Sequence, residues 1–140
     1  MCKRRLTFVL AEDNPGDVFL IRRALDEQGL SYEMAVAGDG EEAIRLVLRA
    51  ASGECPIDLL LVDLNLPKRD GSEVLSELRN CSRLAGVPAI LITSSDSPED
   101  RERFLRLGAN RFFHKPSDLL SFMEIGKLVK DLVASIPVCQ

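Results

Sequence analysis

The sequence predicts an α/β protein in which five strands alternate with five helices and form one parallel sheet. Short apolar segments alternate along the chain with longer segments in which apolar residues recur every three or four positions. Glycine or proline stands at many of the junctions between them. The third apolar segment, residues 57–62, is almost wholly apolar, which suits a central strand covered on both faces. Alternation with short connections implies right-handed βαβ units, with helices on both sides of the sheet.

The first predicted strand, residues 6–11, is an apolar run that ends where acidic residues begin. A helix follows, with Asn14 as its N-cap and Pro15 in its first turn, positions that these residue types favour. Gly29 closes this helix, because glycine readily adopts the left-handed conformation found at helix ends. The apolar residues of the helix share helical spacing: Val18, Ile21, Ala24 and Leu25.

The remaining elements continue the alternation. A second strand is predicted at residues 32–37, a fourth at 87–92 and a short fifth at 111–114. Apolar residues at helical spacing mark the other helices. They are Ala43, Leu46, Val47 and Ala50 in the second helix, Val74, Leu75 and Leu78 in the third, and Phe104, Leu105 and Leu107 in the fourth, which starts at Pro98. The last predicted helix is long and carries Phe122, Ile125, Val129, Leu132 and Ile136.

The composition is that of a soluble globular domain. The 140 residues are 46% apolar and 29% charged, which predicts one domain over residues 1–140, with a core at about 5–136 and no output domain. The net charge of −4 and the pI near 5.1 argue against nucleic-acid binding, which usually needs a basic stripe. No apolar run approaches the length of a membrane span. Four cysteines without a paired spacing are interpreted as reduced thiols of a cytoplasmic protein; they are Cys2, Cys55, Cys81 and Cys139.

Polar residues gather where the predicted strands end. Glu12 and Asp13 follow the first strand, and Asp63 follows the third. Thr93 follows the fourth strand, and Lys115 follows the fifth. In an open parallel sheet, ligands bind beyond the carboxyl ends of the strands, so we expect these side chains to share one edge.

Three carboxylates at one edge repel each other unless a cation lies among them. Mg²⁺ prefers oxygen ligands and would relieve that repulsion. One carboxylate could then act as a nucleophile toward a phosphoryl donor. Phosphoryl transfer needs positioning and neutralisation of charge, which the cation, the Lys115 ammonium and the Thr93 hydroxyl would supply. Each residue taken singly is more often a helix cap or a solvated side chain, and only the combination points to this chemistry.

The chain resembles the receiver domain of bacterial response regulators over nearly its whole length. The matching stretches are residues 9–14 (VLAEDN), 61–71 (LVDLNLPKRDG), 92–94 (ITS) and 115–116 (KP), and their order, spacing and strand context agree. Within the family, the chain is most similar to the single-domain regulators that partner phytochrome kinases. That narrower resemblance is carried by residues 12–17 (EDNPGD), 63–67 (DLNLP) and the loop at 51–56.

The resemblance implies a flavodoxin-like, doubly wound (βα)₅ fold with strand order 2-1-3-4-5. It implies that Asp63 is the phosphoacceptor, assisted by Lys115 and Thr93. The ligands of Mg²⁺ or Mn²⁺ would be Glu12, Asp13, Asp63 and the backbone carbonyl of Asn65. Thr93 and Phe112 would form the switch, although many relatives carry Tyr at the position of Phe112. The Lys115–Pro116 peptide bond would be cis, an uncommon isomer that tends to serve a function.

The resemblance also implies partners. The chain would receive its phosphoryl group from a sensor histidine kinase, such as a bacterial phytochrome, or from a phosphotransfer protein. It would dephosphorylate itself slowly rather than act as an enzyme. Phosphorylation would change the surface of the fourth helix, the fifth strand and the last helix for a downstream protein target. The same face could join two copies in a homodimer; deeper packing of the last helix on the sheet is the alternative, because burial does not follow from periodicity alone. No nucleic-acid or membrane partner is expected.

Three other interpretations are weighed against this one. A phosphatase of the haloacid dehalogenase type also uses a strand-end Asp, but it would carry a second Asp where this chain has Asn65. A flavodoxin-like cofactor carrier would have a Ser-, Thr- and Gly-rich phosphate loop where Glu12 and Asp13 stand. A receiver-like interaction module that is never phosphorylated is the third, and the presence of all five strand-end residues argues against it.

Overall fold

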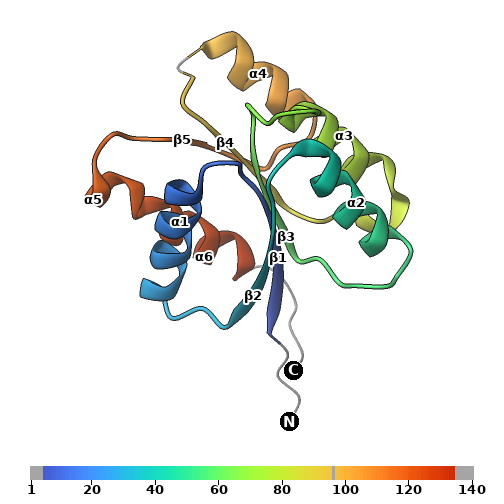
Figure 1. Cartoon of the computed structure of the whole chain (residues 1–140), viewed down its shortest axis with the longest axis horizontal. Coiled ribbons are helices and arrows are strands. Elements are labelled where there is room, and N and C mark those ends of the chain that lie inside the picture. Colours follow the sequence, from blue (N-terminus) through green and yellow to red (C-terminus); the bar gives the residue numbers. More distant parts are fainter. Residues whose placement is uncertain (1–4, 96, 135–140) are drawn as a thin grey trace.

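The computed structural model describes residues 5–95 and 97–134, which include a five-stranded sheet (Figure 1). The strands are β1 (Leu6–Ala11), β2 (Tyr32–Ala37), β3 (Leu59–Asp63), β4 (Ala89–Thr93) and β5 (Arg111–His114). Neighbouring strands are parallel, in the order β2-β1-β3-β4-β5. This topology confirms the predicted fold class and the predicted strand order.

Helices cover both faces of the sheet (Figure 1). They are α1 (Pro15–Glu27), α2 (Gly40–Ala51), α3 (Gly71–Asn80), α4 (Pro98–Arg106), α5 (Leu119–Phe122) and α6 (Glu124–Val133), with a short 3₁₀ helix, η1 (Ser82–Leu84), before β4. Buried side chains of α1, α5 and α6 pack on one face, and those of α2, α3 and α4 pack on the other. The apolar stripes that predicted the helices are thus the faces turned toward the sheet.

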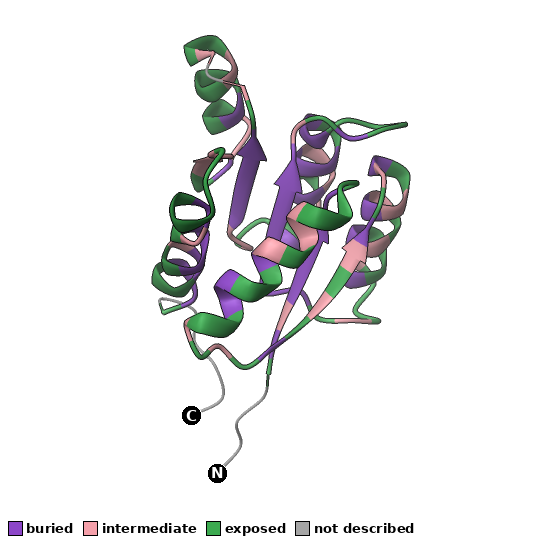
Figure 2. Cartoon of the chain, turned by 60° about the vertical axis from the view of Figure 1, so that its left-hand side comes forward, coloured by how far each residue is buried: buried purple, intermediate pink, exposed green. Residues whose placement is uncertain are grey.

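The two central strands, β3 and β4, are buried along their whole length (Figure 2). Alternate residues point to opposite faces, so Leu61 and Ile90 join the α1 side while Val62 and Leu91 join the α3 side. Both sides of these strands are covered, which explains why their sequences are continuous apolar runs rather than alternating ones.

Both central strands also extend one residue further than predicted, so that β3 ends at Asp63 and β4 ends at Thr93. The two residues had been expected just beyond the strands. Asp63 lies in register with Ile92, and Thr93 lies in register with His114. The sheet itself therefore positions both candidate site residues, with less freedom than a loop would allow.

The sequence predicts one continuous last helix, and this prediction is wrong. The helix is divided at Met123 into α5 and α6. The Gly126 amide donates to the Met123 carbonyl, three residues back, which makes a tighter turn than an α-helix. At Gly126 the helix also meets α1 closely, since a Cβ there would lie 2.4 Å from the Ala24 carbonyl oxygen. The periodic pattern could not show this break. Ile136, the last residue of the predicted helix, lies outside the described residues.

The described residues contain no cis peptide bond, so the predicted cis bond between Lys115 and Pro116 is wrong. Trans is the intrinsically favoured isomer even before proline. With the bond trans, the Lys115 amide donates to the Thr93 carbonyl at 2.7 Å and the side chain still reaches the strand-end carboxylates.

Two further features lie outside the site: the cysteine thiols and the apolar character of the helices. Cys55 and Cys81 carry free thiols, while Cys2 and Cys139 lie outside the described residues. Within residues 5–95 and 97–134, no helix combines the length and the apolar character that a membrane span requires.

Candidate functional site

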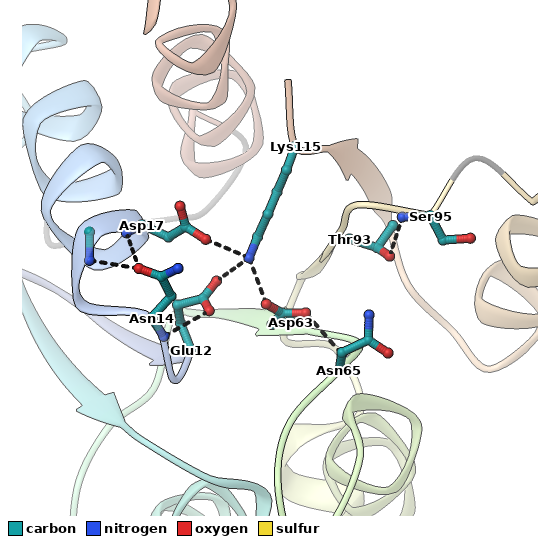
Figure 3. A network of polar contacts seen from close by, with 9 residues as sticks. Glu12, Asn14, Asp17, Asp63, Asn65, Thr93, Ser95 and Lys115 are labelled. Atoms are coloured by element: carbon teal, nitrogen blue, oxygen red, sulfur yellow. Dashed lines mark hydrogen bonds and ion pairs between the residues drawn. The ribbon is translucent and has the colours of Figure 1, made fainter. Parts of the chain in front are cut away.

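The carboxyl ends of four strands bring the predicted site residues to one edge of the sheet (Figure 3). Glu12 directly follows β1, Asp63 ends β3, Thr93 ends β4 and Lys115 directly follows β5. Parallel strands place equivalent ends together, which is why residues separated by up to about a hundred positions share this edge.

The Lys115 ammonium lies at the centre of the site and contacts three carboxylates. Its Nζ atom is 2.7 Å from Asp63 Oδ2, 2.7 Å from Asp17 Oδ2 and 2.8 Å from Glu12 Oε1. Burial alone would lower the pKa of Lys115, but the contacts with these carboxylates outweigh it and raise that pKa above its ordinary value. The ammonium therefore stays charged at any physiological pH.

Glu12 is almost fully buried, with 2% of its surface exposed. Its Oε2 atom accepts a hydrogen bond from the Asn14 amide at 3.2 Å. Its Oε1 atom forms an ion pair with the Lys115 ammonium at 2.8 Å, and the same ammonium donates hydrogen bonds to Asp63 and Asp17. Burial, with a contribution from the Asp63 charge, raises the pKa of Glu12 from 4.5 to about 7 even though Lys115 opposes the shift.

Asp63 is 4% exposed and is held from two sides. Its Oδ2 accepts from Lys115, and its Oδ1 accepts from the Asn65 amide at 2.9 Å. Behind it, α3 begins at Gly71, where an added Cβ would lie 2.5 Å from the Asp63 carbonyl oxygen. Glycine at this position lets the start of α3 approach the strand end without displacing Asp63.

Glu12, Asp13 and Asp63 form a group that could hold a metal ion. One carboxylate oxygen from each lies within 4.8 Å of the others, and Asp13 is exposed whereas its two neighbours are buried. The chemistry of this donor set, three hard oxygen ligands, suits Mg²⁺ or Mn²⁺. The buried Glu12 Oε1 atom has no hydrogen-bond partner besides its ion pair with Lys115, so a cation could share this oxygen. The residues therefore fit a divalent cation. The ligand role of the Asn65 carbonyl stays a prediction.

Thr93 and Phe112 lie apart from the carboxylates. Thr93 is fully buried, and its Oγ1 accepts from the Ser95 amide at 3.0 Å within its own loop. Phe112 is half-buried, with the Arg101 guanidinium 4.8 Å from its ring centroid. The ring borders a hollow of about 270 Å³ between the loop after β4 and α4, lined by Ser95, Ser97, Pro98, Arg101, Glu102, Leu105 and Phe112. Both residues thus border the segment that follows β4.

Asp17 is a site residue that the sequence did not single out. It occurs in the first turn of α1, where acidic residues commonly serve the helix dipole. The spacing of Asp13 and Asp17 could have indicated this role. Four residues make about one helical turn, so the two side chains lie on the same side of the start of α1. Its contact with Lys115, 98 positions away, depends on how α1 packs on the sheet.

Comparison with known proteins identifies the family to which this chain belongs. Residues 8–125 match the Response regulator receiver domain family, so the chain belongs to the receiver domains of response regulators, which work in two-component phosphorelays. Receiver domains carry an acidic cluster, and in this chain Glu12, Asp13 and Asp63 form such a group at the strand ends.

Particular relatives narrow the comparison. The probable methanogenesis regulatory protein FilR2 of Methanothrix harundinacea is 34% identical over 125 residues, which cover 89% of this chain and 79% of the relative. Response regulator Rcp1 of Synechocystis sp. is 30% identical over 113 residues, which cover 79% of this chain and 77% of Rcp1. A structure of the Mn²⁺-bound form of Rcp1 superposes with a TM-score of 0.84 over 96% of this chain and 99% of that one; at the 24% identity of that alignment it supports the fold.

The structure of the phosphorylated cyanobacterial phytochrome response regulator RcpA is similar as well. Its TM-score is 0.84 at 29% identity, covering 96% of this chain and 98% of that chain. These neighbours confirm the narrower resemblance to phytochrome-associated regulators.

Proposed function

We propose that this receiver domain accepts a phosphoryl group on Asp63 from a phosphohistidine donor. The observation that carries the proposal is the environment of the Asp63 carboxylate, which is 2.7 Å from the Lys115 ammonium and within the acidic group formed with Glu12 and Asp13. Glu12 has the same two neighbours, but Asp63 ends the central strand β3 and, by the family resemblance, occupies the position of the phosphoacceptor.

In the proposed transfer, an Asp63 carboxylate oxygen attacks phosphorus and forms a new O–P bond. The P–N bond to the donor imidazole breaks, and its electron pair returns to the nitrogen. Lys115 stabilises the negative charge on the phosphoryl oxygens, and the sheet keeps Asp63 in place. Mg²⁺ or Mn²⁺, held by Glu12, Asp13 and Asp63, would supply further neutralisation of charge. The product is an acyl phosphate on Asp63, which the family resemblance predicts to hydrolyse slowly.

We propose that Thr93 and Phe112 transmit the change. A phosphoryl group adds charge and three acceptor oxygens beside Asp63. Thr93 would exchange its hydrogen bond with the Ser95 amide for one donated to a phosphoryl oxygen, and the half-buried ring of Phe112 would turn inward. The surface of α4, β5 and the last helix would then favour a partner that prefers this shape.

The partners are proposed from the relatives. RcpA is a phytochrome response regulator, which supports a bacterial phytochrome as the sensor histidine kinase for this chain. A phosphotransfer protein could deliver the same group. The face of α4, β5 and α6 is the proposed surface for the downstream target and for a homodimer.

Intact mass spectrometry after incubation with acetyl phosphate tests the proposal. We expect the wild-type chain to gain the mass of one phosphoryl group with Mg²⁺ present and to gain little without it. Asp63→Asn should not be labelled. Asp131→Asn, which changes an exposed carboxylate on α6, should label like the wild type. Stoichiometric labelling of Asp63→Asn would contradict the site.

The second candidate is an interaction module that is never phosphorylated. A folded wild-type chain that stays unlabelled by both acetyl phosphate and a phosphorylated kinase would favour it. Sustained turnover of phosphomonoesters would instead favour a phosphatase.

A further inference from the structure

The Lys115 ammonium donates hydrogen bonds to two carboxylates that come from opposite sides of the site (Figure 3). One belongs to Asp63 at the end of β3, and the other belongs to Asp17 in the first turn of α1. The two bonds have the same length, 2.7 Å. Asp17 is thus as close to the Lys115 ammonium as the candidate phosphoacceptor is.

The start of α1 holds Asp17 in place. The Asn14 side chain caps this helix and accepts hydrogen bonds from the amides of Gly16, at 2.8 Å, and Asp17, at 3.2 Å. Pro15 restricts the backbone of the same turn. Because the Asp17 amide is bound within the cap and its side chain is only 20% exposed, the carboxylate is directed at Lys115 by a rigid element.

Asp17 differs from the other two carboxylates that contact Lys115. Glu12 and Asp63 belong to the group that could hold a cation, and Asp17 does not. In the proposed function, Glu12 and Asp63 must therefore be shared between an ammonium and a divalent cation, whereas Asp17 remains available to the ammonium alone. Ligand oxygens that are engaged by an ammonium are weaker metal ligands, since the two positive charges compete for them.

We infer that Asp17 is a positioning residue, which draws the Lys115 ammonium toward α1 and so leaves Glu12 and Asp63 free to ligate the divalent cation. This inference rests on the proposed function. Without the Asp17 charge, Lys115 would pair with Glu12 and Asp63 only. The ammonium would then occupy the oxygens that the cation requires.

Mn²⁺ binding, followed by the electron paramagnetic resonance signal of the free ion, measures this effect directly. Asp17→Asn should weaken Mn²⁺ binding about tenfold, at the lower end of what loss of an outer-sphere carboxylate usually costs. The matched control is Glu27→Gln, which removes an exposed carboxylate from the same helix, 58% exposed and paired with Arg23. That variant should bind Mn²⁺ within about twofold of the wild type.

A double-mutant cycle with Lys115→Met separates positioning from a simple loss of charge. In the Lys115→Met background, Asp17→Asn can act only through space, and we expect the loss to shrink to about threefold or less. An Asp17→Asn effect of equal size in both backgrounds would overturn the inference, and so would unchanged Mn²⁺ binding in the single variant.

The unmodified chain provides a second measurement, which does not require any variant to fold. In wild-type protein saturated with Mg²⁺, the Lys115 ammonium protons should remain protected from exchange with water, because Asp17 still holds them. Rapid exchange on addition of Mg²⁺ would show that Asp17 does not retain the ammonium, and the inference would fail.

The same Mn²⁺ measurements distinguish an error in the proposed metal site from an error in the role of Asp17. If the wild-type chain does not bind Mn²⁺, or if Asp13→Asn binds it as well as wild type, the proposed site itself is wrong. If the wild type binds, Asp13→Asn does not, and Asp17→Asn is unchanged, the role of Asp17 alone is wrong.

Discussion

The Arg79 guanidinium on α3 donates two hydrogen bonds to the carbonyl oxygen of Gly108, 29 positions away, at 3.0 Å from Nε and 2.7 Å from Nη2. The same group donates to the Val87 carbonyl at 2.5 Å and to Asn110 Oδ1 at 2.8 Å. One side chain therefore ties α3 to the segments that lead into β4 and β5. These acceptors precede the amino ends of β4 and β5, so the contact holds the sheet at the edge opposite the site.

Arg79→Ala should lower the free energy of unfolding by about 3 kcal/mol, because several partly buried acceptors lose their donor at once. Urea denaturation measures this change. Arg106→Ala is the matched control, since Arg106 is 73% exposed and its ion pair with Glu102 spans 4.0 Å. The control should change stability by less than about 0.5 kcal/mol. Equal losses in the two variants would show that the Arg79 contacts are not stabilising.

Gly126→Ala should lower the free energy of unfolding by about 1–3 kcal/mol, although alanine is the better helix former. The reason is steric, since the new Cβ would lie 2.4 Å from the Ala24 carbonyl oxygen and force α6 away from α1. Thermal unfolding followed by circular dichroism tests it. Gly86→Ala is the control, because an added Cβ there meets nothing within 4 Å. A Gly126→Ala variant as stable as wild type would mean that α1 and α6 separate at no cost.

Tyr32 should titrate with a pKa of about 12, raised first by burial and then by the hydrogen bond from its hydroxyl to Asp26 Oδ1 at 2.9 Å. The unfolded chain has the ordinary value of 10.0, so the unfolded state loses this proton first. The stabilisation is therefore complete below about pH 10 and is lost as the pH rises toward 12.

Phenolate absorbance reports this titration cleanly, because the chain has one tyrosine and no tryptophan. Asp26→Asn should move the pKa of Tyr32 back toward 10.0, while Glu27→Gln on the same helix should leave it in place. A wild-type midpoint near 10.0 would contradict the described environment of Tyr32.

Mg²⁺ should stabilise the fold through the proposed cation site. At about 100 times its Kd, a ligand that binds only the native state adds about 2.7 kcal/mol to the free energy of unfolding. Asp13→Asn should abolish this gain and leave the metal-free stability nearly unchanged, because Asp13 is exposed. Melting curves with and without Mg²⁺ provide the measurement. A gain that persists in Asp13→Asn would place the cation elsewhere.

The strand-end residues could be predicted from the sequence because each lies next to a strongly patterned element. Asp63 and Thr93 follow apolar runs that are buried on both faces, and the parallel topology brings strand ends to one edge. Both strands begin two residues later and end one residue later than predicted, and the ladder continues through Asp63 and Thr93 although both are polar.

Asp17 and Arg79 show what sequence patterns miss. Each is a charged residue on a helix, and in sequence each is indistinguishable from a solvated one. Their partners, Lys115 for Asp17 and Gly108 for Arg79, are brought near only when helices pack on the sheet. The break at Met123 likewise depends on packing that no periodic pattern encodes.

By itself, the sequence determined the order and type of the elements, the apolar faces, and the set of acids, hydroxyl and ammonium at the strand ends, because these follow from local spacing and burial. The tertiary structure alone decided which carboxylates Lys115 contacts, how buried Glu12 is, and where α1 meets α6. Those properties arise from distances between elements far apart in the chain, which depend on the packing of side chains between them.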